Sequence, residues 1–158
     1  MRNVEIARDT LPGAYDVEHL KAFHRRLFGD VYGWAGELRT VAITKGWSTF
    51  CLPAFLGEQL RGLFSRLESE NYIRGLKTPG FVERLAYYYG ELNAIHPFRE
   101  GNGRTQRAFF FQLSASANHR LDWSRLDQAA NSEACELSLL AGDATQLVKV
   151  LRPVILSR

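Results

Sequence analysis

One stretch of the sequence concentrates groups that could carry out acid–base and phosphate chemistry. It reads His-Pro-Phe-Arg-Glu-Gly-Asn-Gly-Arg-Thr-Gln-Arg over residues 96–107. Pro97 disfavours the α conformation for the residue before it, so the apolar run through Ile95 is predicted to end its helix near His96. An imidazole at a helix end beside a loop is suited to work as a general base.

A glycine-rich turn, Gly101-Asn102-Gly103, follows this histidine. Glycines accept positive φ angles, and such a turn can point several backbone N–H groups into one concavity that holds phosphate oxygens. A new helix is predicted from Arg104 to Leu113, because this run holds good helix formers and no Gly or Pro. Its N-terminus would direct free N–H groups and the positive end of the helix dipole at the same concavity.

Three charged residues complete the stretch. Arg104 and Arg107 are three positions apart, so both guanidinium groups lie on one helix face and can reach one polyphosphate. The carboxylate of Glu100 stands among these anion-binding groups. That placement is understandable if Mg²⁺ lies between Glu100 and the phosphates, since magnesium is held by one or two carboxylates plus substrate oxygens.

Each of these features alone has a plainer explanation. A Gly-Asn-Gly sequence is most often a turn, paired arginines are most often a solvated face, and a histidine at a helix end usually has no chemistry. Their occurrence together within one dozen residues favours a site.

The stretch resembles the signature of the Fic (filamentation induced by cAMP) family, His-Pro-Phe-x-Asp/Glu-Gly-Asn-Gly-Arg-x-x-Arg, and matches it at every specified position. The resemblance implies a protein adenylyltransferase, which moves AMP from Mg-ATP to a Ser, Thr or Tyr hydroxyl of a target protein and releases pyrophosphate. The residues themselves do not choose between attack on the α- and the γ-phosphate; that choice comes from the resemblance.

The resemblance also implies a role for each motif residue. His96 would be the catalytic base, and Glu100 would be the magnesium ligand. The phosphates would be held by Asn102 with the backbone of Gly101, Gly103 and Arg104, and the outer phosphates by the side chains of Arg104 and Arg107, with Arg107 on the γ-phosphate.

A β-hairpin is predicted over Arg39–Phe50. Arg39 to Thr44 alternates apolar and polar residues as a strand does, Lys45-Gly46 supplies a turn, and residues 47–50 can return as a second strand. In the Fic family the similar hairpin is a flap, whose exposed edge can pair with a segment of the target protein. Lys45 and Gly46 would then lie near the nucleotide; the alternative is an ordinary surface turn.

The rest of the chain is predicted to be helical and to form one domain over residues 1–158. The fold class is therefore all-α, a compact Fic-type helical domain with a small β-hairpin flap over the active site. Helical spacing of apolar residues places the other helices at 16–28, 53–71, 81–96, 124–130, 133–140 and 145–155. Pro153 is expected to kink or end the last one.

Composition limits the class of protein and of partner. A content of 46% hydrophobic and 23% charged residues is ordinary for a globular domain. The net charge of +3 is small and spread along the chain, and no nucleic-acid reader motif occurs, so no direct nucleic-acid partner is expected. No apolar run is long enough to span a bilayer. Two cysteines far apart, without a leader peptide, favour a cytoplasmic protein, and delivery into another cell by a secretion system stays open.

Fic proteins commonly carry an inhibitory helix with the pattern Ser/Thr-x-x-x-Glu-Gly/Asn, whose glutamate pairs with the second motif arginine. The nearest match here ends in Glu70-Asn71, but Arg66 stands where Ser or Thr is required. The resemblance therefore suggests an unrestrained transferase or the toxin half of a toxin–antitoxin pair, in which a small antitoxin brings a glutamate to Arg107.

Several alternatives remain at the level of function. The same phosphate nest could serve a phosphotransferase, or a binding module without catalysis. Bacterial topoisomerase subunits, as for toxin-like relatives, and host small GTPases, as for secreted effectors, are both allowed as targets.

Overall fold

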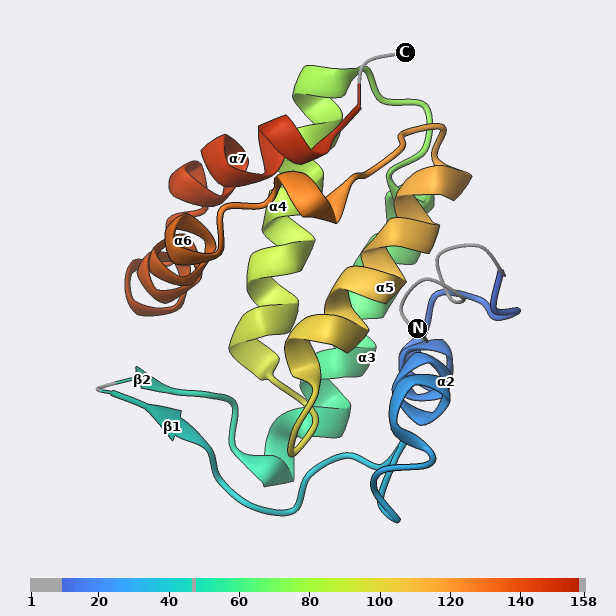
Figure 1. The fold of residues 1–158 in the computed structure, drawn as a ribbon, viewed down its shortest axis with the longest axis vertical. Coiled ribbons are helices and arrows are strands. Elements are labelled where there is room, and N and C mark those ends of the chain that lie inside the picture. Colours follow the sequence, from blue (N-terminus) through green and yellow to red (C-terminus); the bar gives the residue numbers. More distant parts are fainter. Residues whose placement is uncertain (1–9, 47, 157–158) are drawn as a thin grey trace.

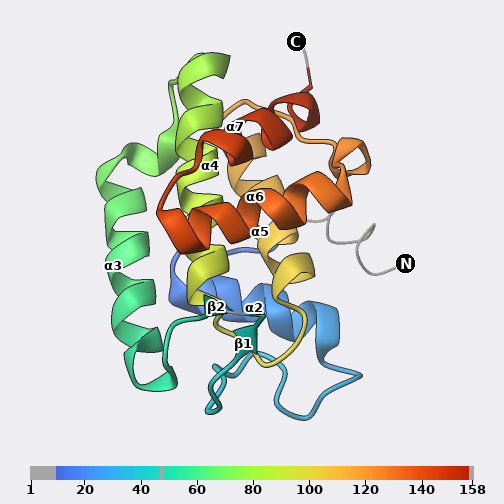
Figure 2. The same cartoon turned by 90° about the vertical axis from the view of Figure 1, so that its left-hand side faces the viewer.

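The structure, a computed structural model, describes residues 10–46 and 48–156. Six α-helices make up most of this part of the chain, together with one two-stranded hairpin (Figures 1 and 2). The elements are α2 (Val17–Phe28), β1 (Thr44–Lys45), β2 (Ser48–Thr49), α3 (Leu56–Ser69), α4 (Thr78–Ile95), α5 (Asn102–Ser116), α6 (Gln128–Ala141) and α7 (Thr145–Leu151), with 3₁₀ turns at Pro53–Phe55, Asn71–Ile73, Trp123–Arg125 and Arg152–Val154. The predicted all-α class with a small hairpin is confirmed.

Helix α4 is the centre of the domain and packs against α3, α5, α6 and α7. Nearly every second or third residue along it is buried, from Phe81 at one end to Ile95 at the other. Pro79 lies in its first turn, where a missing N–H costs nothing, so the helix begins slightly before the predicted position. It ends before His96, as Pro97 predicts. The most buried helix therefore delivers the candidate base.

The helix predicted over residues 16–28 is confirmed as α2. The Asp16 side chain caps it by accepting a hydrogen bond of 3.0 Å from the backbone N–H of His19. Its apolar face packs on α5, where the rings of Phe23 and Phe109 meet edge to face at 5.9 Å. Helix α2 is thus fixed against the helix that carries both motif arginines.

The hairpin is shorter than predicted. Thr44 pairs with Thr49 and Lys45 with Ser48, whereas the residues from Arg39 to Ile43 are not in a strand. A strand needs a partner for its backbone, and the Arg39 N–H instead donates to the Pro97 carbonyl at 3.0 Å. The prediction of a strand beginning at residue 39 is therefore wrong. Trp47 of the predicted return strand lies outside the described residues.

The C-terminal half also differs from the prediction. The two helices expected at 124–130 and 133–140 are one 3₁₀ turn followed by the single helix α6. Asp127 caps α6 through a bond of 3.1 Å from the Ala130 N–H, while the hydroxyl of Ser124 donates to the side chain of Asp122. Pro153 does end α7, and the chain continues as a 3₁₀ turn. Within residues 10–46 and 48–156, no helix is both long and apolar enough to cross a bilayer.

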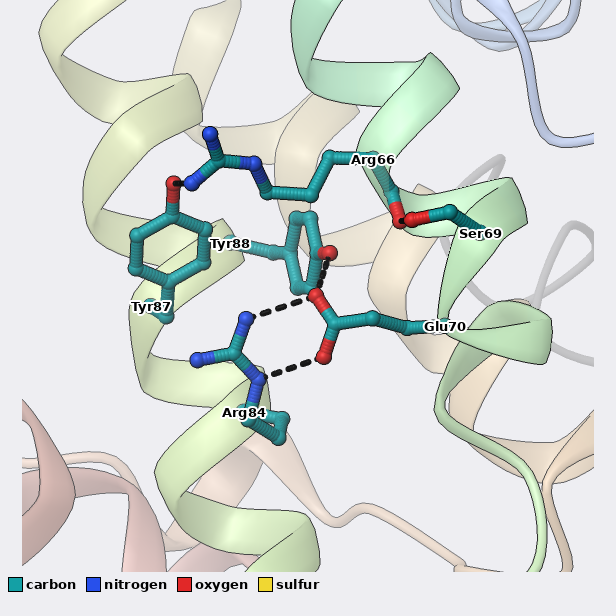
Figure 3. A network of polar contacts seen from close by, with 6 residues as sticks. All are labelled: Arg66, Ser69, Glu70, Arg84, Tyr87 and Tyr88. Atoms are coloured by element: carbon teal, nitrogen blue, oxygen red, sulfur yellow. Dashed lines mark hydrogen bonds and ion pairs between the residues drawn. The ribbon is translucent and has the colours of Figure 1, made fainter.

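A polar cluster ties the end of α3 to α4 (Figure 3). Both carboxylate oxygens of Glu70 accept hydrogen bonds from Arg84, at 2.6 and 2.7 Å, and the Tyr88 hydroxyl donates to the same carboxylate. Arg66 donates to the Tyr87 hydroxyl at 2.6 Å. Glu70 is the glutamate of the imperfect inhibitory pattern, and its carboxylate is occupied within this cluster. It is engaged by α4 rather than by Arg107 on α5.

Replacing Glu70 with glutamine is expected to lower the free energy of unfolding by about 1–2 kcal/mol at pH 7, because a charge-assisted pair is lost at a partly solvated position. Arg84 holds the pKa of Glu70 below its usual value. The carboxylate therefore stabilises the fold above its unfolded-state pKa, and this contribution disappears as the pH falls through the lowered value. Urea unfolding of the wild type and of Glu70→Gln should show a difference in the free energy of unfolding that becomes smaller in acid. Glu68→Gln, which removes the same charge at an exposed position of α3, is the control; a difference independent of pH would contradict the expectation.

Candidate active site

His96 directly follows α4. The α4–α5 loop and the hairpin lie at the same end of the domain (Figure 1). His96 takes the left-handed conformation, with φ of 50°, and this turns the chain out of α4. Its ring stacks on Phe50, just after β2, with centroids 4.0 Å apart and an interplanar angle of 13°. The flap therefore fixes one face of the ring.

The environment of His96 keeps its ring uncharged. Burial lowers the pKa of His96 to about 4, and the positive charges of Arg39 and Lys45 act in the same direction. The Asn93 carbonyl acts the other way, but the buried Nδ1 makes no hydrogen bond of normal geometry with any described residue. At neutral pH the imidazole can accept a proton, as a general base must.

The side chain of Arg39 contacts the backbone of His96, and Arg39 is only 4% exposed. Its Nε donates to the His96 carbonyl at 2.7 Å, and one terminal nitrogen donates to the carbonyls of Ile95, at 3.1 Å, and Cys51. The other terminal nitrogen donates to the Val41 carbonyl at 2.8 Å. One side chain thus joins the end of α4 to both ends of the flap.

Helix α5 begins directly after a glycine in the left-handed conformation. Gly101 has φ of +79°, and a Cβ at this position would lie 2.3 Å from the Phe28 ring. The first helical hydrogen bond runs from the Thr105 N–H to the Gly101 carbonyl at 3.1 Å. The N–H groups of Asn102, Gly103 and Arg104 come before it and have no acceptor within the helix, so they are available to an anion.

Asn102 holds the loop rather than presenting its amide to the cavity. Its side-chain oxygen accepts from the Phe98 N–H at 2.8 Å, and its side-chain nitrogen donates to the Phe98 carbonyl at 2.6 Å. The residue is 7% exposed. What Asn102 can offer a phosphate is therefore its backbone N–H.

Glu100 is positioned through its backbone. Its carbonyl accepts from Nε2 of His24 at 2.9 Å, and Nδ1 of the same ring accepts from the Gly36 N–H at 2.8 Å. These two partners set the tautomer of His24, whose ring also stacks on Phe98 at 4.0 Å. The carboxylate of Glu100 is left exposed beside the cavity.

Two cavities meet at His96. The first, of about 440 Å³, is lined by the α4–α5 loop and the first turns of α5, including Glu100, Arg104 and Arg107. The second, of about 410 Å³, lies between the flap and α6, and its wall includes Asn131 and Cys135. His96 belongs to both walls, so a molecule in either space would lie next to this residue.

Both motif arginines, Arg104 and Arg107, line the first cavity. The Arg107 guanidinium covers Gly103 so closely that a Cβ there would lie 3.1 Å from one of its terminal nitrogens. The indole N–H of Trp123 donates to the Arg107 carbonyl at 3.0 Å. A side chain on Gly103 would require the Arg107 guanidinium to shift by a few tenths of an ångström.

The two flap residues of the predicted site differ in position. Lys45 lines the second cavity, and its charge acts on both His96 and Cys135. Gly46 forms the hairpin turn with φ of +60° and lines neither cavity. Lys45 is therefore within reach of a bound molecule, whereas Gly46 shapes the turn that carries it.

The described residues hold no cluster of three or more metal-binding side chains. A magnesium ion bound with a nucleotide does not require one, since phosphates and water supply most of its ligands. The exposed Glu100 carboxylate, on the same cavity wall as Arg104 and Arg107, suits such an ion.

Comparison with known proteins identifies the family. Residues 14–114 match the Fic/DOC family. The chain belongs to this family. It is 42% identical over 134 residues to the protein adenylyltransferase VbhT of Bartonella schoenbuchensis, a match that covers 85% of this chain and 28% of VbhT. It is 41% identical over 137 residues to the probable protein adenylyltransferase Fic of Escherichia coli K12, covering 87% of this chain and 68% of that protein.

Solved Fic structures have the same fold. The effector BepC of Bartonella tribocorum, solved with bound AMPPNP, superposes with a TM-score of 0.91 at 25% identity, over 99% of this chain and 82% of BepC. The effector BepA gives a TM-score of 0.85 at 28% identity, over 98% of this chain and 58% of BepA. The comparisons confirm the Fic family, the fold class and the enzyme class that the motif implied.

Sequence reasoning missed four residues that contact the candidate site residues and hold them in place: Arg39, His24, Phe50 and Trp123. Arg39 and His24 had no local signal, because each acts through partners distant in the sequence. The apolar–polar alternation around Arg39 predicted a strand, and it gave no sign that the arginine side chain would be buried. Phe50 was assigned to the returning strand, which placed it near the site without indicating its stacking on His96.

Proposed function

We propose that this Fic domain transfers AMP from Mg-ATP to a Ser, Thr or Tyr hydroxyl of a target protein. The observation that carries the proposal is an uncharged His96 shared by two cavities, one of which is lined by a helix N-terminus and two arginines. Relatives at about 40% identity are named protein adenylyltransferases, and BepC binds an ATP analogue.

In the proposed reaction, His96 takes the proton of the target hydroxyl while that oxygen attacks the α-phosphorus of ATP. The bond between the α-phosphorus and the bridging oxygen breaks, and pyrophosphate leaves. The first cavity would hold the phosphates on the N–H groups of α5 and on Arg104 and Arg107. The second cavity is the space left for the nucleoside, with polar groups at Asn93, Asn131 and Ser132.

Glu100 would hold the magnesium ion against the phosphates. A magnesium ion supplies charge neutralisation of the phosphate oxygens. The contribution of the chain is to fix the Glu100 backbone through His24 and to keep the carboxylate at the cavity wall.

The target protein is proposed to dock along the flap, residues 39–50. The hairpin has only two short strands, so its outer edges have no third strand among the described residues. An extended target segment could pair there by main-chain hydrogen bonds and bring its hydroxyl to His96. A topoisomerase subunit and a small GTPase both remain candidate targets, and the solved relatives named as translocated effectors make delivery into another cell a second candidate role.

We also propose a toxin–antitoxin role, in which a partner protein supplies the inhibitory glutamate. The sequence has no intact inhibitory pattern, and Glu70 of the imperfect one is engaged by Arg84 and Tyr88. A partner glutamate that reached Arg107 would neutralise the guanidinium and occupy its hydrogen-bond donors.

A peptide that carries the intact inhibitory pattern is therefore expected to weaken ATP binding to the wild type and to have little effect on Arg107→Ala. The measurement is calorimetric titration of ATP with and without the peptide. The same peptide with its glutamate replaced by glutamine is the control. Equal inhibition of both proteins would place the antitoxin contact elsewhere.

The experiment that tests the proposed function is labelling of cell lysate with ATP that carries the label on the α- or the γ-phosphate. AMP transfer predicts labelled protein from α-labelled ATP alone, and mass spectrometry would identify the adenylylated Ser, Thr or Tyr. Label from γ-labelled ATP would favour a phosphotransferase. Nucleotide binding without any labelled protein would favour a binding module.

A further inference from the structure

The buried guanidinium of Arg39 has no part in the proposed reaction. In the part of the chain that the structure describes, no carboxylate pairs with it, although the side chain is 4% exposed. A buried cation without a counter-ion is costly unless its donors are satisfied. Arg39 meets this requirement with backbone carbonyls alone.

The four carbonyls come from two places. Ile95 and His96 supply the last carbonyls of α4, where the helix dipole is negative and favours a cation. Val41 and Cys51 supply carbonyls on the two sides of the hairpin, one before β1 and one after β2. The planar guanidinium of Arg39 therefore joins the two ends of the flap to each other. It also bonds them to His96, the candidate general base.

Two backbone hydrogen bonds also join the flap to the end of α4. Together with the four bonds of the Arg39 side chain they form what we call the seam. The Arg39 N–H donates to the Pro97 carbonyl at 3.0 Å, and the Cys51 N–H donates to the Ala94 carbonyl at 3.2 Å. Phe50, next to Cys51, stacks on the His96 ring. The position of the ring thus depends on a seam whose central side chain is Arg39.

We infer that Arg39 is a positioning residue for the base: it fastens both ends of the flap to the end of α4 and so sets where the His96 ring lies against Phe50. The functional meaning rests on the proposed role of His96 in AMP transfer. The contacts themselves do not depend on that role.

Lysine cannot replace Arg39 in this arrangement. An ammonium group is a compact charge at one point, whereas the guanidinium spreads its five N–H donors over a planar fork. Arg39→Lys keeps the positive charge near His96 and loses the fork, and Arg39→Met loses both. The two variants therefore separate the charge of Arg39 from its bridging geometry.

The first readout is hydrogen exchange of the backbone amides of residues 39 and 51, measured by NMR without nucleotide. Exchange at Leu85, in the buried middle of α4, reports global unfolding and serves as the reference. Relative to Leu85, both seam amides are expected to exchange about tenfold faster or more in Arg39→Met and in Arg39→Lys.

The second readout is the NMR titration of the His96 imidazole, with its signal assigned by His96→Gln. Arg39 and Lys45 act on His96 from the flap side. The other charged or titratable groups that line the two cavities with His96 are Arg99, Glu100, Arg104 and Arg107 on the first, and Cys135 and Glu136 of α6 on the second. In Arg39→Met the pKa of His96 is expected to rise from about 4 toward the ordinary 6.5. Arg39→Lys keeps the nearby positive charge and is expected to raise the pKa of His96 less than Arg39→Met does.

Arg84→Met is the matched control, since it removes another arginine that bridges two elements. Arg84 precedes His96 by about three helical turns, roughly 18 Å along α4. This variant should lose stability without changing the seam amides, relative to Leu85, or the His96 pKa.

The inference would be overturned if a folded Arg39→Met protein had the wild-type amide exchange at residues 39 and 51 and the wild-type pKa of His96. It would also be overturned if Arg84→Met changed both quantities as much as Arg39→Met does. If Arg39→Met does not fold, wild-type seam exchange in Arg39→Lys would overturn it, and faster exchange there would support it. Both readouts omit ATP, so failure of the proposed reaction would leave them interpretable.

Discussion

Replacing His96 with alanine is expected to lower the rate of AMP transfer by about 10²–10⁴-fold, the usual contribution of a general base. The ring is uncharged at neutral pH and lies on the wall shared by the two cavities, so no other described side chain stands in the same place. The measurement is incorporation of label from α-labelled ATP into protein.

Binding of ATP to His96→Ala should stay close to that of the wild type, because the phosphate-binding groups belong to α5. His119→Ala is the matched control. Its ring is also buried, stacks on Phe81 at 3.9 Å and bonds the Leu76 carbonyl, roughly 20 Å from His96 along α4. That variant should be less stable and still transfer AMP. Full transfer by His96→Ala would remove the histidine from the mechanism.

Replacing Gly101 with alanine is expected to lower the free energy of unfolding by about 2–4 kcal/mol and to abolish ATP binding. Two effects add. The backbone has φ of +79°, which an L-residue adopts at a cost, and the new Cβ would lie 2.3 Å from the Phe28 ring. Since Gly101 precedes α5, any shift moves the N–H groups that face the phosphates. Denaturant unfolding and calorimetric titration with ATP measure the two results.

Gly75→Ala separates the two effects. Gly75 has nearly the same φ, +78°, and an added Cβ there would meet nothing within 4 Å. It should cost only the conformational term of about 1–2 kcal/mol and leave ATP binding intact. Trimming the ring in the double variant Gly101→Ala/Phe28→Leu should recover part of the lost stability. Equal losses in the two glycine variants would show that the contact with Phe28 has no energetic importance.

Local rules predicted the elements correctly where the cause lies within a few residues. Asp16 caps α2, Pro97 sets the end of α4, and Pro153 ends α7, because each acts on its own or the adjoining backbone. The strand from residue 39 failed because a strand depends on a partner. The same apolar–polar alternation occurs in strands and in extended segments whose N–H groups donate to residues outside any sheet, as the Arg39 N–H does.

The same distinction applies to the site. The sequence alone placed together the residues proposed to hold the phosphates, since residues 96–107 are contiguous and the glycine turn and helix start are local. Its match to a family signature supplied the reaction. Only the tertiary structure decided that Arg39 reaches the end of α4, that His24 holds Glu100, and that α6 walls the second cavity. Those contacts join elements far apart in the chain, and buried polar groups take whichever partner the packing brings to them.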